Sequence, residues 1–248
     1  KYDAVVLFFI DAFGWRFYER FQDSPFIKRI AKYGKIEKLT SQFQSTTAAH
    51  VTTMHTSLPV GMSGVYEWIY YEPNVDQIIA PLLFSHSGTK ERDTLNPKRV
   101  NAADIYPKGI LYPELKKMGV DSFNFGLRDY TPSTYSNIVM EGSEMRPYKT
   151  LSEAFVNMGL LLEKQKNPTY IHLYFEKIDA VCHEYGPASP QAEAEIETFL
   201  LMMEHYFERI FNGKKKILFL MTADHGMCEI DPQTTTYLNI NPNFEGFQ

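Results

Sequence analysis

The chain has 248 residues, of which 44% are hydrophobic and 22% charged, and this is the composition of a globular protein. Its net charge of −5 at pH 7 argues against a nucleic-acid duplex as partner, and its two cysteines argue against a disulfide-stapled secreted fold. No apolar run approaches the roughly 18 residues of a membrane span. No signal peptide is recognisable, so we expect a cytoplasmic location.

Strand-like and helix-like patterns alternate along the chain. Continuous apolar runs predict buried strands, and capping residues followed by a one-sided apolar stripe predict helices. In chain order, the predicted elements are a strand at 4–10, a helix at 25–33, a strand at 36–39, a helix at 48–57 stopped by Pro59 and Gly61, a helix at 107–118, a strand at 120–125, a helix at 151–164, a strand at 169–175, a helix at 190–212, and strands at 217–221 and 235–240. Residues 126–149 and the aromatic-rich residues 66–108 show no clear pattern, so we expect loops there, the latter an inserted segment.

The alternation predicts one α/β domain over residues 1–248, built as a three-layer α/β/α sandwich with a large, mostly parallel central sheet. In such sheets, ligands bind beyond the carboxyl ends of the strands. Asp11, Asp179 and Asp224 each follow an apolar strand, and Thr47 follows the short strand at 36–39. We therefore expect four separate segments to deliver reactive side chains to one edge of the sheet.

Each of these side chains, taken alone, has an ordinary structural explanation. A Thr at a helix start caps backbone N–H groups, an Asp after a strand forms a turn, and Asp179 and His183, four residues apart, form an exposed pair on a helix. Together, carboxylates and imidazoles suit zinc or another divalent metal, and two metals clamp the oxygens of a phosphoryl displacement. A Thr hydroxyl beside such cations is a nucleophile for phosphorus.

The segment around Thr47 resembles the nucleophile segment of the alkaline phosphatase superfamily, and within it that of the type I phosphodiesterase/nucleotide pyrophosphatase family. That segment ends in a Thr-Gly-Leu-x-Pro type of turn and a Gly-Ile pair. Thr56 to Val60 and Gly64-Val65 fit this pattern without gaps. The fit places the nucleophile on Thr47, with Thr46 as the alternative one residue away.

Three further motifs carry the same resemblance and occur in the family's order. They are the strand-terminal Asp at Asp11, the Asp-x-x-x-His and Gly-Pro pattern at Asp179, His183 and Gly186-Pro187, and the Asp-His-Gly-Met motif at residues 224–227. The resemblance implies two divalent metal sites, with Zn²⁺ as the expected ion and Mn²⁺ as the alternative. Their implied ligands are Asp11, Asp224 and His225 at one site, Asp179 and His183 at the other, and Thr47 between them. It also implies a covalent phospho-enzyme on Thr47, which water then hydrolyses.

Two positions depart from the family pattern. The family supplies the second metal with another His downstream, but no His follows His225 in this sequence, and we expect the chain to continue past Gln248. The family also uses an Asn side chain to hold the transferring phosphoryl group, and ungapped counting puts Trp68 at that position. The backbone N–H of Thr47 would then carry this task alone.

The expected function is metal-dependent hydrolysis of a phosphodiester, with a small phosphorylated substrate such as a nucleotide. The alternatives are a phosphomonoesterase, a phosphonate hydrolase, a phosphomutase relative, or a non-catalytic protein that binds phosphorylated ligands. Trp68 and Tyr70 are candidate substrate-binding residues, because aromatic rings stack on bases or cover a site. Ordinary packing of a long loop is the alternative explanation of both residues, and the sequence favours it slightly.

Overall fold

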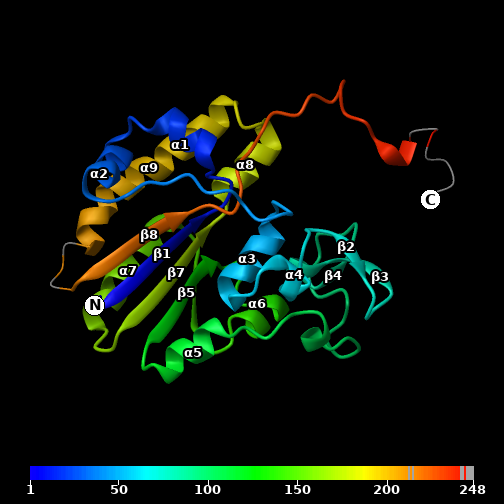
Figure 1. Ribbon diagram of the computed structural model, residues 1–248, viewed down its shortest axis with the longest axis horizontal. Coiled ribbons are helices and arrows are strands. Elements are labelled where there is room, and N and C mark those ends of the chain that lie inside the picture. Colours follow the sequence, from blue (N-terminus) through cyan, green and yellow to red (C-terminus); the bar gives the residue numbers. More distant parts are fainter. Residues whose placement is uncertain (212, 214, 241–242, 244–248) are drawn as a thin grey trace.

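The central sheet of the protein has five parallel strands in the order β6-β5-β7-β1-β8 (Figure 1). The computed structural model describes residues 1–211, 213, 215–240 and 243. The strands are β1 Ala4–Ile10, β5 Asp121–Leu127, β6 Glu144–Tyr148, β7 Thr169–Phe175 and β8 Ile217–Thr222. The middle strands β7 and β1 are buried on both faces, which explains their continuous apolar sequence. The predicted α/β fold with a mostly parallel sheet is confirmed.

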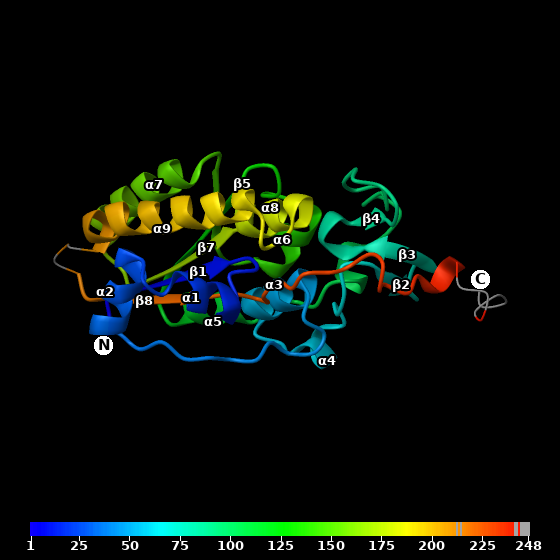
Figure 2. The ribbon, with the colours of Figure 1, turned by 90° about the horizontal axis from the view of Figure 1, so that it is seen from above.

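Helices cover both faces of this sheet, and Figure 2 shows the layers with α7 and α9 on one side and α3 and α5 on the other. The helices are α1 Trp15–Phe21, α2 Pro25–Tyr33, α3 Thr47–Thr56, α4 Val60–Ser63, α5 Leu111–Lys117, α6 Thr134–Val139, α7 Leu151–Lys164, α8 Lys177–Tyr185 and α9 Pro190–Phe211, with short 3₁₀ turns at Pro81–Leu83, Ala102–Asp104 and Leu238–Ile240. Successive side chains of a strand point to opposite faces, so Phe8 and Phe9 of β1 enter two different core clusters. None of the described helices is long and apolar enough to cross a membrane.

The aromatic-rich segment 66–108 contains a second, antiparallel sheet of three strands. These are β2 Tyr70–Glu72, β3 Gln77–Ala80 and β4 Ser85–His86, in the order β2-β3-β4. The sheet lies to one side of α4, beyond the end of α3 (Figure 1). The expectation of an irregular segment was wrong here, because strands this short show no readable alternation.

Several other boundaries differ from the sequence predictions. No strand forms at 36–39 or at 235–240: neither segment pairs with a strand of the two sheets, and Leu238–Ile240 forms a 3₁₀ turn instead. The predicted loop at 126–149 holds α6 and β6, and Pro147 fits β6 because that strand lies at the edge of the sheet. Helix α3 ends at Ser57 in a left-handed conformation, and Pro59 starts α4 instead of merely ending α3. The chain beyond residue 240, apart from residue 243, lies outside the described residues.

Candidate active site

The carboxyl edge of the central sheet carries a cluster of buried acidic groups and imidazole. Asp11 directly follows β1, and Asp224 lies just beyond β8, the neighbouring strand. Both carboxylates are 2% exposed. A cavity of about 880 Å³ opens at this edge, and five of the six predicted metal ligands line it: Asp11, Thr47, Asp179, His183 and His225.

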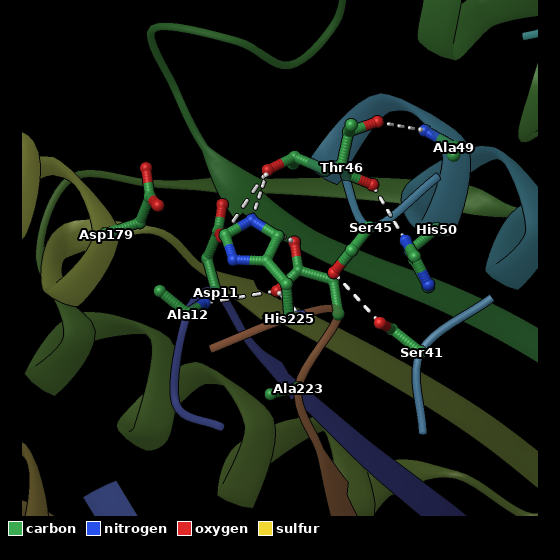
Figure 3. A network of polar contacts seen from close by, with 12 residues as sticks. Asp11, Ala12, Ser41, Ser45, Thr46, Ala49, His50, Asp179, Ala223 and His225 are labelled. Carbon is green, nitrogen blue, oxygen red and sulfur yellow. Dashed lines mark hydrogen bonds and ion pairs between the residues drawn. The ribbon is translucent and has the colours of Figure 1, made fainter. Parts of the chain in front are cut away.

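Thr47, Asp11 and His225 converge at this edge, and Figure 3 shows the network around Asp11 and His225. The hydroxyl Oγ1 of Thr47 lies 3.1 Å from Nε2 of His225 and 3.5 Å from Oδ1 of Asp11. His225 Nε2 is also 3.4 Å from Oδ1 of Asp11 and 3.5 Å from Oδ2 of Asp224. Three segments far apart in the sequence thus place one hydroxyl, one imidazole and two carboxylates within contact distance.

The side chains of His225 and Asp224 are oriented so that their atoms face one another without enough hydrogen-bond donors between them. Nδ1 of His225 lies 3.1 Å from the carbonyl oxygen of Gly226, which can only accept, so Nδ1 donates to it. The other ring nitrogen, Nε2, faces the carboxylates of Asp11 and Asp224. Asp224 uses Oδ1 to accept from the N–H groups of Ala12 and His225, at 3.1 and 2.9 Å, while its buried Oδ2 has no hydrogen-bond donor among the described residues.

A divalent cation fits this arrangement of acceptors. Asp11, Asp224 and His225 each offer a ligand atom within 4.8 Å of the other two. A ligating imidazole ordinarily donates its second N–H to a carbonyl or carboxylate, as His225 does to Gly226. The donor set of two carboxylates and one imidazole suits zinc or another transition metal.

The pKa of Asp11 reflects its burial and the negative charges beside it. Burial, then the charges of Asp224 and Asp179, raise the pKa of Asp11 to about 10. Its other oxygen, Oδ2, accepts a short hydrogen bond from the Tyr174 hydroxyl. Tyr174 was not identified from the sequence, because its place in β7 gives the pattern of a core aromatic residue.

Asp179 and His183 lie side by side on α8, at the second half of the site. His183 Nε2 is 3.5 Å from Oδ1 of Asp179, and this oxygen is buried without a hydrogen-bond donor among the described residues. Burial raises the pKa of Asp179. The side chain of His183 is 73% exposed, so this half of the site is the more open one.

The two adjacent threonines have different surroundings. Thr46 is the N-cap of α3, and its hydroxyl accepts from the N–H of Ala49 at 3.5 Å (Figure 3). Thr47 is the first residue of the helix and turns its hydroxyl to Asp11 and His225. His50 fixes the approach to the helix, because its Nδ1 lies 2.8 Å from the Thr46 carbonyl oxygen and its Nε2 accepts from the N–H of Gln42 at 3.2 Å.

Close contact between two glycines holds the loop after β1 against the loop after β8. A Cβ atom on Gly14 would lie 2.5 Å from the Cα atom of Gly226, a distance that side chains do not tolerate. Glycine at position 14 therefore lets Asp11 and the Asp224-His225 pair approach each other.

The aromatic candidates separate in the structure. Trp68 lines the cavity and is 44% exposed, whereas Tyr70 is buried in the second core cluster, with its ring centroid 4.5 Å from that of Tyr66. Tyr70 is not among the described residues that line the cavity.

Glu176, which the sequence analysis did not select, is buried directly after β7 and lines the cavity. The signal that selected Asp11, an acidic residue ending an apolar strand, also marks Glu176.

Comparison with known proteins places the chain in a family. The model of the type I phosphodiesterase/nucleotide pyrophosphatase family matches residues 5–243. No curated protein sequence gives a significant match.

Solved structures with a similar fold include murine ectonucleotide pyrophosphatase/phosphodiesterase 5, an inactive threonine-to-alanine variant in complex with AMP, with a TM-score of 0.73 and 16% identity over 96% of this chain and 62% of that one. The human form of this protein gives a TM-score of 0.67 and 16% identity over 92% of this chain and 58% of that one. Phosphonoacetate hydrolase from Sinorhizobium meliloti, in complex with phosphonoacetate, gives a TM-score of 0.58 and 15% identity over 89% of this chain and 55% of that one.

At these identities the similarities establish the fold. The chain spans less than two thirds of the length of each of these structures. Because the family model covers the chain almost from end to end, the protein belongs to the type I phosphodiesterase/nucleotide pyrophosphatase family.

Proposed function

We propose that this protein is a metal-dependent phosphoester hydrolase that acts on phosphodiesters through Thr47. The observation that carries the proposal is the position of the Thr47 hydroxyl, 3.1 Å from an imidazole nitrogen and 3.5 Å from a buried carboxylate, in the lining of a cavity of about 880 Å³. Membership of the phosphodiesterase family supports the reaction class. The inactive threonine-to-alanine variant of a structural neighbour supports a threonine as nucleophile.

The acceptor cluster supports two divalent metal ions, which we assign as zinc, with manganese as the alternative. Asp11, Asp224 and His225 would hold one ion together with the Thr47 hydroxyl, and Asp179 and His183 would hold the other. When bound, these ions would lower the pKa of the threonine hydroxyl and offset negative charge on the phosphoryl oxygens.

The residues of the chain then divide the reaction between them. The Thr47 oxygen attacks phosphorus, a Thr Oγ–P bond forms, and the P–O bond to one alcohol breaks. The threonine proton is lost and the departing alcoholate takes up a proton, while the phosphorus stays on Thr47 with its second ester substituent. Water then cleaves the Thr Oγ–P bond, which restores the threonine hydroxyl and releases a phosphomonoester. The first N–H groups of α3 have no intrahelical acceptor, so those of Thr47 and Ala48 are available to the phosphoryl oxygens.

The substrate side of the proposal is a small phosphorylated molecule, with a nucleotide as one candidate because a structural neighbour is in complex with AMP. Trp68 lies on the cavity wall, where its ring can cover a bound substrate. Since an indole cannot replace the amide that the family uses there, we expect a phosphoryl-transfer rate lower by about 10² or more. The cytoplasmic location remains a prediction from the sequence.

The test is hydrolysis of bis(4-nitrophenyl) phosphate by the purified protein with zinc or manganese. Thr47→Ala should lower kcat at least about 10³-fold, since it removes the attacking atom. Thr46→Ala is the matched control: it should lower stability by about 0.5–2 kcal/mol through loss of the cap while turnover persists. Activity retained in Thr47→Ala and lost in Thr46→Ala would refute the assignment of the nucleophile.

A further inference from the structure

The cavity at Thr47 continues inward along α3 to polar side chains that the proposed reaction does not use. Thr47, Val51 and His55 line it, and at spacings of four residues they form one stripe on the helix. Because an α-helix rises about 1.5 Å per residue, this stripe is about 12 Å long. We call the part of the cavity between Thr47 and His55 the α3 slot.

The opposite wall of the α3 slot is the central sheet. Asn124 of β5 and His172 of β7 are register partners on neighbouring parallel strands, so their side chains lie together on one face. Both line the cavity, and both are almost fully buried, at 2% and 1% exposure. Two residues along β7 from His172, Tyr174 contacts Asp11. The sheet wall therefore runs from the carboxylate cluster to the inner end of the slot.

The inner end of the slot is polar but uncharged. Tyr112 donates its hydroxyl hydrogen to Asn124 Oδ1 at 2.9 Å, and its oxygen lies 2.6 Å from Nδ1 of His55. Since Tyr112 has one hydrogen to give, His55 Nδ1 donates to it and His55 Nε2 is an acceptor. Burial and the neighbouring His172 lower the pKa of His55, and burial lowers the pKa of His172 to about 3, so both rings are neutral near pH 7.

His172 is the one member of this group whose side chain makes no hydrogen bond among the described residues. Its Nε2 is enclosed and has no partner, although its ring lies edge-to-face with His55 at a centroid distance of 4.6 Å. A buried polar atom of this kind is normally paired, so its isolation marks a place for a ligand atom. Val51 and Met140, which belong to the core cluster on this face of the sheet, give the same cavity apolar walls.

We propose that the α3 slot binds the ester substituent of the substrate, and that it selects a substituent with an apolar, ring-containing body and an uncharged hydroxyl or amide at its far end, which His172 recognises. An apolar pocket with a few placed polar groups is how proteins select such molecules. A carboxylate or phosphate at the same end would be buried among neutral groups without a counter-charge. The assignment of the slot to the substrate rests on the proposed hydrolase function.

The binding test uses 4-hydroxybiphenyl, which contains no phosphorus, and biphenyl-4-carboxylate, titrated calorimetrically into the zinc-loaded protein. We expect the alcohol to bind wild type at least tenfold more tightly than the carboxylate. His172→Phe keeps a ring but removes both nitrogens, and should weaken binding of the alcohol at least fivefold. His205→Phe, a change at an exposed histidine on α9, is the matched control and should bind like wild type.

A second variant keeps the test decisive if His172→Phe does not fold. Val51→Phe narrows the slot halfway along its length while His172 stays in place, and it too should weaken binding of the alcohol at least fivefold. Equal binding of the two probes by wild type, or undiminished binding by a folded Val51→Phe, would overturn the proposal. Far-UV circular dichroism and thermal unfolding identify the folded variants.

Turnover separates this inference from the proposed function. If the slot holds the ester substituent, 4-hydroxybiphenyl inhibits hydrolysis of bis(4-nitrophenyl) phosphate competitively. Inhibition of another type, or turnover without any binding of the alcohol, would overturn the slot and leave the hydrolase. Binding of the alcohol to a protein that cleaves no phosphoester would overturn the hydrolase and leave the slot as a binding site.

Discussion

Replacement of Asp11 by asparagine should change how the stability of the metal-free protein depends on pH. Burial, with Asp224 and Asp179 adding to it, raises the pKa of Asp11 from its ordinary value of 3.8 to about 10. The folded protein therefore keeps a proton that the unfolded chain has already lost. This contribution to stability is complete below about pH 4 and is lost as pH rises toward 10. One extra proton in the folded state gives a slope of at most about 1.4 kcal/mol per pH unit.

The assay is urea unfolding of chelator-treated protein at several pH values between 5 and 8. An amide side chain does not titrate, so the free energy of unfolding of Asp11→Asn should fall less steeply with pH than that of wild type, by up to about 1.4 kcal/mol per pH unit. Asp23→Asn, a change at an exposed carboxylate, should keep the wild-type slope. The buried His55 and His172 are common to all three proteins, so their effects cancel in the difference. With saturating zinc, the free energy of unfolding of wild type should instead rise with pH, because metals bind deprotonated carboxylates. Equal slopes for wild type and Asp11→Asn would refute the argument that Asp11 holds a proton in the absence of metal.

Two further predictions concern the second metal and the core. His183→Ala should lower the zinc content from two ions per chain to one, because the set of Asp11, Asp224 and His225 stays intact. Plasma mass spectrometry after dialysis measures this content. Loss of both ions, or of neither, would contradict the assignment of the second metal site. Phe8→Ala should lower the free energy of unfolding by about 3–5 kcal/mol, because the ring is fully buried and stacks on Phe155 at 5.8 Å. A loss under about 1 kcal/mol in urea titrations would show that the site collapses around the missing ring.

The sequence was most informative where the chain is most buried. The strands at 4–10 and 169–175 are continuous apolar runs because neighbouring strands and helices cover both of their faces, and such runs need no partner to be recognised. The run at 217–221 also forms a strand, but the expectation that it is buried was wrong, because β8 lies at the edge of the sheet and Leu220 is 43% exposed. Once three of them were identified, the acidic residues that follow had to meet at one edge. The helix at 190–212 was equally clear, since one apolar face persists over its whole length.

Features that depend on pairing or on depth could not be read in the same way. The strands β2 to β4 are two to four residues long, and their register is set by their neighbours. Tyr70 and Trp68 look alike as aromatic residues of one segment, yet one is buried in a core and the other lines the cavity. His172 has the sequence context of a core strand residue, and only the register of β7 against β5 brings it to the α3 slot.

The most direct test of the central claim is to find the covalent intermediate. The wild-type protein, turning over bis(4-nitrophenyl) phosphate with zinc, is quenched in acid, digested and mapped by tandem mass spectrometry. We predict a 4-nitrophenylphosphoryl group, or the phosphate that remains after its hydrolysis, on Thr47. Sustained turnover with no adduct, or with the adduct on Thr46 or elsewhere, would contradict the account.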